Sequence, residues 1–245
     1  MNKKVCHIIG AGEFEKFSYL ENDFIIAVDG GYEHIKKIGI KPNLLIGDFD
    51  SIKNIPHDIK KICLPTKKDF TDTYAAIQEG IKYGCEIFHI HGGTGARFAH
   101  TIANMQLLAD MSQKKFATYL HGRNFTATAI TNDKILFDES QKGYISIFSH
   151  TDKSFGVNII GLKYELKNAV LTNKFPLGVS NEFLQKQSLI SVERGTLILI
   201  YWIILLPWIK IKKCVQKNLF DLFWLIMQIL MLWIIYKSFS WQMFH

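Results

Sequence analysis

Five short apolar runs in the first half of the chain each end in a cluster that contains glycine. The runs cover residues 5–9, 24–28, 44–46, 86–90 and 116–120 of the 245-residue sequence. Runs this short and this continuously apolar are typical of strands that are buried on both faces. We therefore predict a mostly parallel sheet. In an open sheet of this kind, ligands bind at the carboxyl ends of the strands, where the five clusters would lie.

Helical patterns fill two of the gaps between these runs, at residues 71–83 and 100–111. The apolar residues at helical spacing are Tyr74, Ile77 and Ile81 in the first segment and Ile102, Met105 and Leu108 in the second. Short β-rich segments separated by turns follow, up to residue 202. The sequence thus predicts an N-terminal α/β catalytic domain over 1–122 and a C-terminal all-β sandwich domain over 123–202.

The last 44 residues differ from the rest in composition. All five tryptophans lie in 202–245, together with five lysines and one aspartate, so this segment carries +4 of the net charge of +7. We treat 203–245 as an atypical hydrophobic C-terminal tail. It is a membrane-associated segment with its lysines at anionic lipid, an extra helix covering a hydrophobic surface, or translation past a frameshifted stop codon. The nearly neutral remainder predicts no nucleic-acid partner.

The cysteines and the N-terminus indicate the compartment. The four cysteines, at positions 6, 63, 85 and 214, include no CxxC pair, which argues against a disulfide framework and against a zinc site. The first residues lead directly into an apolar strand, without the long apolar stretch of a signal peptide. We expect a cytoplasmic protein.

Two strand-end clusters have the composition of phosphate-binding loops. Gly10-Ala11-Gly12 lets the backbone approach a phosphate and offers N–H groups, although a plain tight turn has the same sequence. It lacks the spacing and the Lys-Ser/Thr pair of a P-loop, which excludes P-loop NTPases. The cluster at 91–100 places three glycines and Arg97 before a helix whose N-terminus attracts anions; a flexible turn with a surface arginine is the alternative.

Acidic residues gather at two further places. Asp48 and Asp50 are two residues apart, so an extended segment would point both carboxylates to one side. Paired carboxylates suit Mg²⁺, which binds one or two of them together with substrate phosphates; a solvated acidic turn is the alternative. Asp69 and Asp72, at the start of a helix, either share a face or cap the helix.

Five motifs in order resemble those of the thiamine pyrophosphokinase family. They are DGG (29–31), GDFDS (47–51), K-D-x-T-D (68–72), GGTGxR (92–97) and GVSNEF (178–183). The resemblance covers residues 5 to about 201. It implies an α/β catalytic domain, a thiamine-binding β-sandwich, and a homodimer with active sites at the subunit interface. The implied reaction moves the pyrophosphoryl group of ATP onto thiamine, with Mg²⁺ as cofactor, and releases AMP.

The resemblance also implies roles for individual residues. The catalytic residues would be Asp48, Asp50, Asp72 and Arg97, and the first three would also bind the metal. ATP would be bound by Gly10, Gly12, Asp29, Gly30, Gly31, Lys68, Asp69, Gly92, Gly93, Thr94 and Arg97. Thiamine would be bound by Ser180 and Asn181, which on local evidence form a capped turn.

One position inside the motifs departs from the family pattern. The glycine-arginine loop of the family continues Arg-x-Asp-His, whereas this chain has Arg97-Phe98-Ala99-His100. Loss of a carboxylate at a metal or ATP site costs several kcal/mol of transition-state stabilisation. A catalytically impaired thiamine- or nucleotide-binding homologue is therefore an alternative function. A membrane-tethered scaffold, held by the tail, is another.

Overall fold

The computed structural model describes residues 3–50, 52, 57–95 and 97–202. These residues belong to one compact unit that runs from Met1 to Ile204. All three interpretations of the tail concern residues outside this description. Among the described residues, no helix is both long and apolar enough to cross a membrane.

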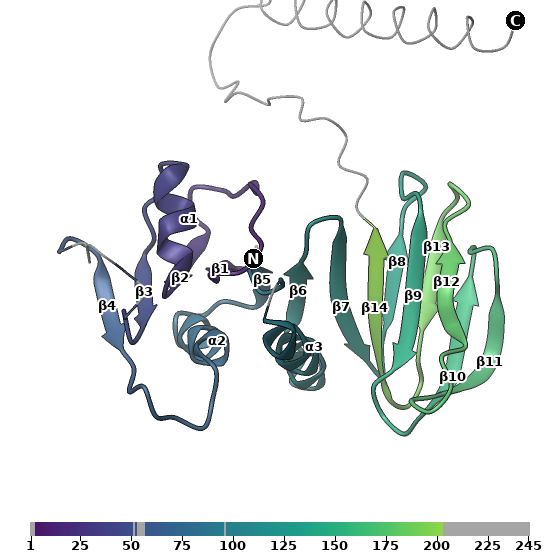
Figure 1. Cartoon of the computed structure of the whole chain (residues 1–245). Coiled ribbons are helices and arrows are strands. Elements are labelled where there is room, and N and C mark those ends of the chain that lie inside the picture. The colour runs from purple at the N-terminus through teal and green to yellow at the C-terminus, as the bar shows by residue number, and fades with distance from the viewer. Residues whose placement is uncertain (1–2, 51, 53–56, 96, 203–245) are drawn as a thin grey trace, which may run out of the picture. The chain divides into compact units, whose positions relative to one another are not determined.

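The first half of the chain forms the parallel sheet that the apolar runs predict (Figure 1). Six strands lie side by side in the order β6-β5-β1-β2-β3-β4, and all neighbours among them are parallel. Their bounds are β1 Val5–Ile9, β2 Phe24–Val28, β3 Leu44–Gly47, β4 Lys60–Cys63, β5 Ile87–His91 and β6 Ala117–His121. The predicted α/β half is confirmed, with β4 as a strand that the sequence analysis missed.

Helices cover both faces of this parallel part. Side chains of α2 (Asp72–Lys82) and α3 (Phe98–Gln113) pack with Cys6 and Ile8 of β1 in one apolar core. The short helix α1 (Gly31–Lys37) packs in a second core on the opposite face. The prediction for Ile102 is wrong, because it is 45% exposed. The buried side of α3 carries Leu108, as expected, together with Leu107 and Met111.

The second half continues the same sheet with antiparallel strands. Beyond β6 the order is β7 (Phe125–Thr131), β14 (Thr196–Trp202), β9 (Tyr144–Ser149) and β12 (Gly178–Glu182), giving ten strands in all. A separate sheet contains β8 (Lys134–Phe137), β13 (Ser188–Ser191), β10 (Lys153–Ile160) and β11 (Leu166–Thr172). The predicted sandwich is confirmed as a fold.

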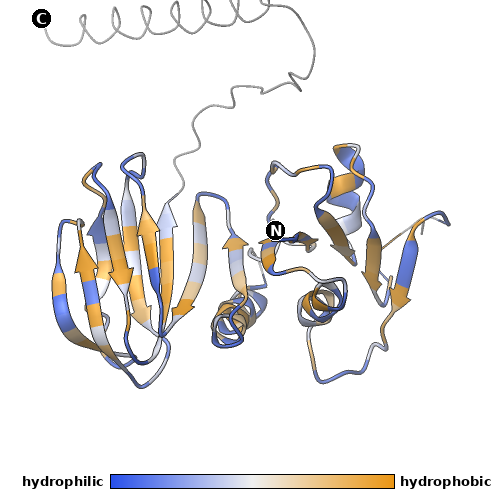
Figure 2. Ribbon diagram, turned by 180° about the vertical axis from the view of Figure 1, so that it is seen from behind, coloured by the Kyte–Doolittle hydropathy of each residue, from blue (hydrophilic) through white to orange (hydrophobic). Residues whose placement is uncertain are grey.

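An apolar core fills the space between the two sheets of the sandwich. Ile145 and Ile147 of β9 and Leu197 and Leu199 of β14 are buried in it, opposite Val157 and Ile159 of β10. Hydrophobic residues recur along the strands of both sheets, and the turns between them are largely hydrophilic (Figure 2). Because β6 and β7 are hydrogen-bonded neighbours, one sheet runs through both predicted domains. The domain boundary at 122/123 stays a prediction.

Candidate functional site

A cavity of about 260 Å³ opens at the carboxyl ends of β1, β2 and β5, next to the N-termini of α2 and α3. The predicted site residues that line it are Gly10, Gly12, Asp29, Asp72, Gly92, Gly93, Thr94 and Arg97. Its other lining residues, which were given no role from the sequence, are Ala11, Val28, Thr71, Thr73, His100 and Asn104. The strand-end pattern thus predicts the place of the cavity and about half of its wall.

The two glycine loops pack backbone against backbone. The N–H groups of Gly10 and Gly12 donate to the carbonyl oxygens of His91 and Gly92, each at 2.8 Å. A Cβ atom on Gly12 would collide with the carbonyls of Gly92 and Thr94, so no larger residue fits there. The expectation that both glycine N–H groups are offered to a phosphate is therefore wrong. These glycines make room for the neighbouring loop, and their role in ATP binding stays a prediction.

Asp29 lies directly after β2, half-buried, with a backbone φ of +44° that non-glycine residues rarely adopt. Its Oδ1 accepts a long hydrogen bond of 3.4 Å from the Phe49 N–H. Burial, and then the nearby negative charge of Asp72, raise the pKa of the Asp29 carboxyl to about 6. Asp29 is thus a carboxyl group that can gain or lose a proton near neutral pH. The adjoining Gly30 and Gly31 begin α1 rather than line the cavity.

Asp48 and Asp50 do not have the geometry that their spacing suggests. Phe49 between them has a φ of +63°, so the segment is a turn rather than an extended strand. The Asp50 N–H donates to Oδ1 of Asp48 at 3.3 Å, which is the acidic-turn arrangement. Asp48 is nevertheless close enough to shift the pKa values of Asp29 and Lys68. It therefore belongs to the same charge cluster, although it lies outside the wall of the cavity.

Lys68 and Asp72 form the ion pair of the site. Lys68 Nζ lies 2.8 Å from Asp72 Oδ1, and only 10% of its side chain is exposed. Burial lowers the pKa of Lys68, but the charges of Asp72, Asp48 and Asp29 outweigh this effect and raise the pKa above its usual value. Thr71 caps α2 by accepting from the Tyr74 N–H at 3.2 Å. Asp69 faces a different groove, between α2 and α3.

The carboxylate oxygens of the cavity suit a hard cation that also binds the phosphates of a substrate. Asp29 and Asp72 supply carboxylate oxygens, the ligand type that Mg²⁺ takes, with Asp48 near them. Within the described part of the chain, no three histidine, cysteine or acidic side chains are arranged as a complete metal cage. Mg²⁺ needs only one or two carboxylates when phosphates and water complete its shell.

The N-terminal turn of α3 forms the basic wall of the cavity. Arg97 stands at the N-cap position, and the first turn of the helix has no acidic residue. No carboxylate of the first turn therefore neutralises the partial positive charge of the helix end. His100 and Asn104 follow at spacings of three and four residues, which puts them on the same side of the helix as Arg97. This spacing was a signal that could have identified them from the sequence.

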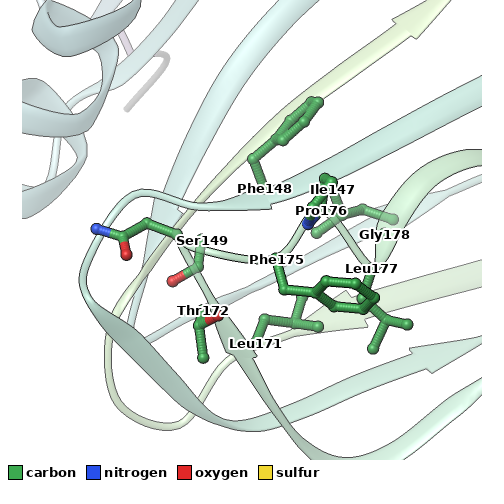
Figure 3. A pocket seen from close by; sticks show the side chains of 10 residues that line it. Ile147, Phe148, Ser149, Leu171, Thr172, Phe175, Pro176, Leu177 and Gly178 are labelled. Atoms are coloured by element: carbon green, nitrogen blue, oxygen red, sulfur yellow. The ribbon is translucent and has the colours of Figure 1, made fainter.

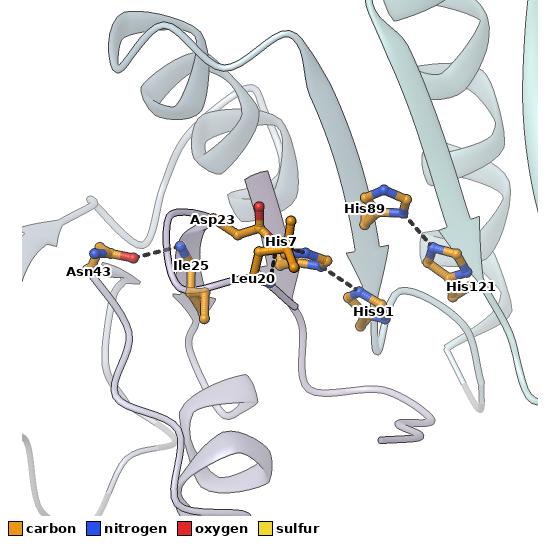
Figure 4. A network of polar contacts seen from close by, with 8 residues as sticks. All are labelled: His7, Leu20, Asp23, Ile25, Asn43, His89, His91 and His121. Atoms are coloured by element: carbon orange, nitrogen blue, oxygen red, sulfur yellow. Dashed lines mark hydrogen bonds and ion pairs between the residues drawn. The ribbon is translucent and has the colours of Figure 1, made fainter. Parts of the chain in front are cut away.

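Four histidines from three neighbouring strands, His7 of β1, His89 and His91 of β5 and His121 of β6, lie in a row (Figure 4). His7 Nδ1 lies 3.1 Å from His91 Nε2, and His89 Nδ1 lies 2.8 Å from His121 Nε2. Phe17 stacks on His91 with ring centroids 4.1 Å apart. Burial lowers the pKa values of all four rings, to about 3 for His89 and about 4 for His121, so the row is neutral at physiological pH. Stacking of Phe17 on this row fixes the segment that follows Gly12.

Two family models match the chain on either side of its midpoint. Thiamin pyrophosphokinase, catalytic domain, matches residues 18–120, and thiamin pyrophosphokinase, vitamin B1 binding domain, matches residues 133–197. The chain belongs to the thiamine pyrophosphokinase family. The family and the enzyme class predicted from the motifs, a thiamine diphosphokinase, are thereby confirmed.

Individual relatives of the family agree with this assignment. Thiamine pyrophosphokinase of Bacillus subtilis is 28% identical over 187 residues, which cover 74% of this chain and 87% of the relative. Thiamin pyrophosphokinase 1 of Caenorhabditis elegans is 28% identical over 175 residues, covering 66% and 72%. The crystal structure of the Bacillus subtilis thiamine pyrophosphokinase matches with a TM-score of 0.75 at 25% identity, over 82% of this chain and 100% of that one.

Ala99, the departure from the thiamine pyrophosphokinase pattern, is exposed in the first turn of α3. It is not part of the cavity wall, whereas Arg97 and His100 on either side of it are. Neither the fold nor the comparisons favour the alternative of an impaired homologue.

Ser180 and Asn181 lie on β12, at the far edge of the ten-stranded sheet. Asn181 is 3% exposed, and its amide is occupied: it donates to the Tyr164 carbonyl at 2.7 Å and accepts from the Tyr164 and Glu182 N–H groups. Ser180, with a φ of +58°, is exposed. In this conformation of β12, the side chain of Ser180 is exposed to a ligand and that of Asn181 is not.

A second, much smaller cavity of about 50 Å³ lies at the start of β12 (Figure 3). Phe148, Leu171, Phe175 and Leu177 line it, and Phe175 and Leu177 are more than half exposed. It is separate from the cavity of about 260 Å³ at the carboxyl ends of β1, β2 and β5. It contains none of the residues that were predicted as catalytic, so it is not a candidate for the reaction centre.

Proposed function

We propose that this chain transfers the pyrophosphoryl group of ATP to the hydroxyethyl oxygen of thiamine, giving thiamine diphosphate and AMP. One observation carries the proposal. A cavity lined mainly by residues of the matched catalytic region brings together two carboxylates, an arginine and a helix N-terminus at the carboxyl edge of a parallel sheet. Phosphoryl transfer requires little of a protein beyond positioning and neutralisation of charge, which are the functions these groups supply.

The basic wall of the cavity would bind the phosphates of ATP. Arg97 can hold two phosphate oxygens at once through its planar guanidinium group. The N-terminus of α3 adds backbone N–H groups and a partial positive charge, since its first turn contains no acid. In the reaction, the thiamine oxygen forms a bond to the β-phosphorus, and the bond from the β-phosphorus to the oxygen of AMP breaks.

Of the three predicted metal ligands, Asp72 lies in the cavity wall and would hold Mg²⁺ together with Asp48, whereas Asp50 is exposed. When bound, the ion neutralises phosphate charge and stabilises the charge that develops on the leaving AMP. The Lys68 ammonium, 2.8 Å from Asp72, keeps the carboxylates from repelling one another and stays within reach of a phosphate. Lys68 and Asp69 complete the predicted ATP-binding set, with Asp69 facing the outer groove.

Asp29 is the residue best suited to accept the proton from the thiamine hydroxyl. A general base works best when its pKa is close to the working pH, and burial raises the pKa of Asp29 to about 6. The carboxyl group lines the cavity and lies close to the charges of Asp48 and Asp72. Deprotonated Asp29 would take the proton as the oxygen attacks, and would release it to water after AMP has left.

A homodimer with shared active sites follows if Ser180 contacts thiamine. Five strand spacings separate β12 from β5, which is ~24 Å at about 4.8 Å per spacing. A thiamine at Ser180 cannot therefore react in the cavity of its own chain. A second copy would bring its β12 to the cavity, so that each site would combine the Asp72 of one chain with the Ser180 of the other.

Mixed dimers test this arrangement. The variants Asp72→Asn and Ser180→Arg are each expected to be inactive alone. Co-expressed with two different affinity tags and purified as the mixed species, they would form one site with both residues intact. We expect about half of the wild-type activity per mixed dimer. Activity no higher than that of the separate variants would mean that the site lies within one chain.

The function itself is tested with the full-length chain, thiamine, ATP and MgCl₂. Thiamine-dependent AMP and thiamine diphosphate should appear in equal amounts, and both should vanish with excess EDTA. Tight binding of thiamine and ATP with no AMP would instead support the impaired homologue. The expected cytoplasmic location and the role of the tail stay predictions.

A further inference from the structure

Asn104 is a buried polar residue on the inner side of α3. It is 4% exposed, and it lines the cavity seven residues after Arg97. Its Nδ2 donates to the carbonyl oxygen of Gly93 at 2.7 Å, which is a short bond for an amide donor. A buried amide costs free energy unless it is hydrogen-bonded. The bond from α3 to the glycine loop is therefore the interaction that keeps Asn104 in the core.

This bond fixes the orientation of one peptide unit in the wall of the cavity. In a trans peptide the C=O and N–H groups point in opposite directions. With the Gly93 carbonyl directed at Asn104, the N–H of Thr94 points away from Asn104. The next carbonyl, that of Thr94, accepts from the Glu13 N–H at 2.8 Å, so the following peptide is held as well.

Close packing around Gly93 restricts the conformation of the glycine loop. A Cβ atom on Gly93 would come within 2.8 Å of Ile90 and Leu120 and 2.9 Å of Asn104 Nδ2. Gly93 is therefore pressed against the core on one side and bonded to α3 on another. Of the three atoms nearest to such a Cβ, the Asn104 amide nitrogen is the polar one, and its hydrogen bond to the Gly93 carbonyl sets the direction in which the peptide faces.

Thr94 has two donors without acceptors among the described residues. Its N–H makes no backbone hydrogen bond there, and its Oγ1 is buried without a partner. Leaving a buried donor unpaired costs ~1–3 kcal/mol, which a bound oxyanion next to Thr94 would recover. Thr94 shares the cavity wall with Arg97, the residue expected to hold phosphate.

We propose that Asn104 is a positioning residue that aims the Thr94 N–H at an oxygen of the transferred pyrophosphoryl group. It touches neither substrate in this role, and acts through the Gly93–Thr94 peptide. The proposal rests on the proposed function for the identity of the anion, but the loop geometry on which it depends is independent of that function.

Two variants of Asn104 separate positioning from folding. Asn104→Leu keeps the volume and removes the donor, and Asn104→Asp keeps the shape but puts an acceptor against the Gly93 carbonyl. Ser112→Ala is the matched control, because Ser112 is also buried on α3 and donates to Thr131 Oγ1 at 2.9 Å, near the other end of the helix. Steady-state kinetics, thermal unfolding and calorimetric binding of inorganic triphosphate are measured for all four proteins.

We expect kcat to fall about 10- to 100-fold in both Asn104 variants, because a misplaced donor loses much of the effect of one transition-state hydrogen bond. KM for thiamine should stay within twofold, and triphosphate should bind at least about fivefold more weakly. Ser112→Ala should lower the unfolding temperature and leave kcat within twofold.

Two results would overturn the proposal. One is a kcat within twofold of wild type in the Asp variant. The other is a fall in kcat that is proportional to the loss of stability in all three variants, Ser112→Ala included. If the wild-type chain forms no AMP, the proposed function fails by itself. Triphosphate affinity then decides, and unchanged affinity in both Asn104 variants overturns the positioning role.

Discussion

Buried polar side chains in the parallel and antiparallel halves of the ten-stranded sheet differ in how fully they are hydrogen-bonded. Asn181, in the antiparallel half, satisfies its amide with three hydrogen bonds inside the chain. Asn104, in the parallel half, is equally buried but lies on a cavity, beside Thr94, whose hydroxyl has no partner among the described residues. Asp29 adds a φ of +44° and a raised pKa to the same half. An unpartnered hydroxyl and a strained carboxyl group thus lie together at the cavity of the parallel half.

The largest effect should come from Asp72, at the centre of the charge cluster. Asp72→Asn removes a carboxylate from the cavity and leaves Lys68 without its partner. We expect kcat to fall by about 10²- to 10³-fold, the usual range for one group that stabilises transition-state charge. Asp138→Asn is the control, because Asp138 follows β8 in the separate sheet, is exposed, and has a carboxylate that accepts from the Ser140 N–H. Comparable losses in the two variants would abolish the contrast between the halves.

Acid should destabilise the protein through the histidine row of the parallel half. The folded-state pKa values are lowered, to about 3 for His89 and about 4 for His121, against 6.5 in the unfolded chain. The unfolded state therefore binds protons first, and the stability contributed above pH 6.5 is lost as the pH falls toward 4. The expected loss is about 1.4 kcal/mol per pH unit for each such histidine. Urea unfolding at pH 7, 6 and 5 measures it.

A variant of the row checks the origin of this slope. His89→Phe keeps an aromatic ring in the stack and removes one titrating group, so the pH dependence should decrease by about one proton. The same slope in the variant and the wild type would place the acid sensitivity elsewhere in the chain.

A smaller effect separates the two neighbours on β12. Asn181→Ala should cost ~2–3 kcal/mol of stability, because the backbone groups of Tyr164 lose their partners. Ser180→Ala should leave stability within about 0.5 kcal/mol of wild type, because the side chain is exposed. It should raise KM for thiamine, because the exposed hydroxyl is the group expected to contact thiamine. Denaturant unfolding and kinetics together distinguish the roles. If Asn181→Ala raises KM for thiamine at unchanged stability, Asn181 is a ligand residue after all.

The smallest effect is expected at Ala99. Ala99→Asp places a negative charge in the first turn of α3, where it would stabilise the helix by ~0.3–1 kcal/mol. Since Ala99 lies outside the cavity wall, we expect kcat within threefold of wild type. A tenfold or greater gain would show that the natural chain is impaired by this substitution.

Regular patterns made most of the fold predictable. Continuous apolar runs predicted five strands of the parallel sheet, because burial on both faces demands that composition. Strand β4 was missed because it is an edge strand whose Lys60 and Lys61 are exposed. Helix α1 was missed because seven residues are too few to show a helical period. Strand β12 was missed because residues around Ser180, which form a bulge in the structure, have a sequence typical of a turn.

The site was predictable where its residues follow strands, and not where contacts cross between elements. Asn104 contacts the glycine loop from within a helix, and no local motif announces that bond. The spacing of Asp48 and Asp50 was misleading, because the positive φ of Phe49 turns the segment. Gly10 and Gly12 were correctly placed, but their N–H groups are bonded to the neighbouring loop.

Transfer of labelled pyrophosphate tests the central claim most directly. The full-length chain is incubated with thiamine, MgCl₂ and ATP that carries ³²P at the β-phosphorus, and the products are separated. The account predicts label in thiamine diphosphate, an equal amount of unlabelled AMP, and loss of both in Asp72→Asn. Label that appears in ADP, with thiamine monophosphate as the other product, would contradict it, as would equal transfer by the Asp72→Asn variant.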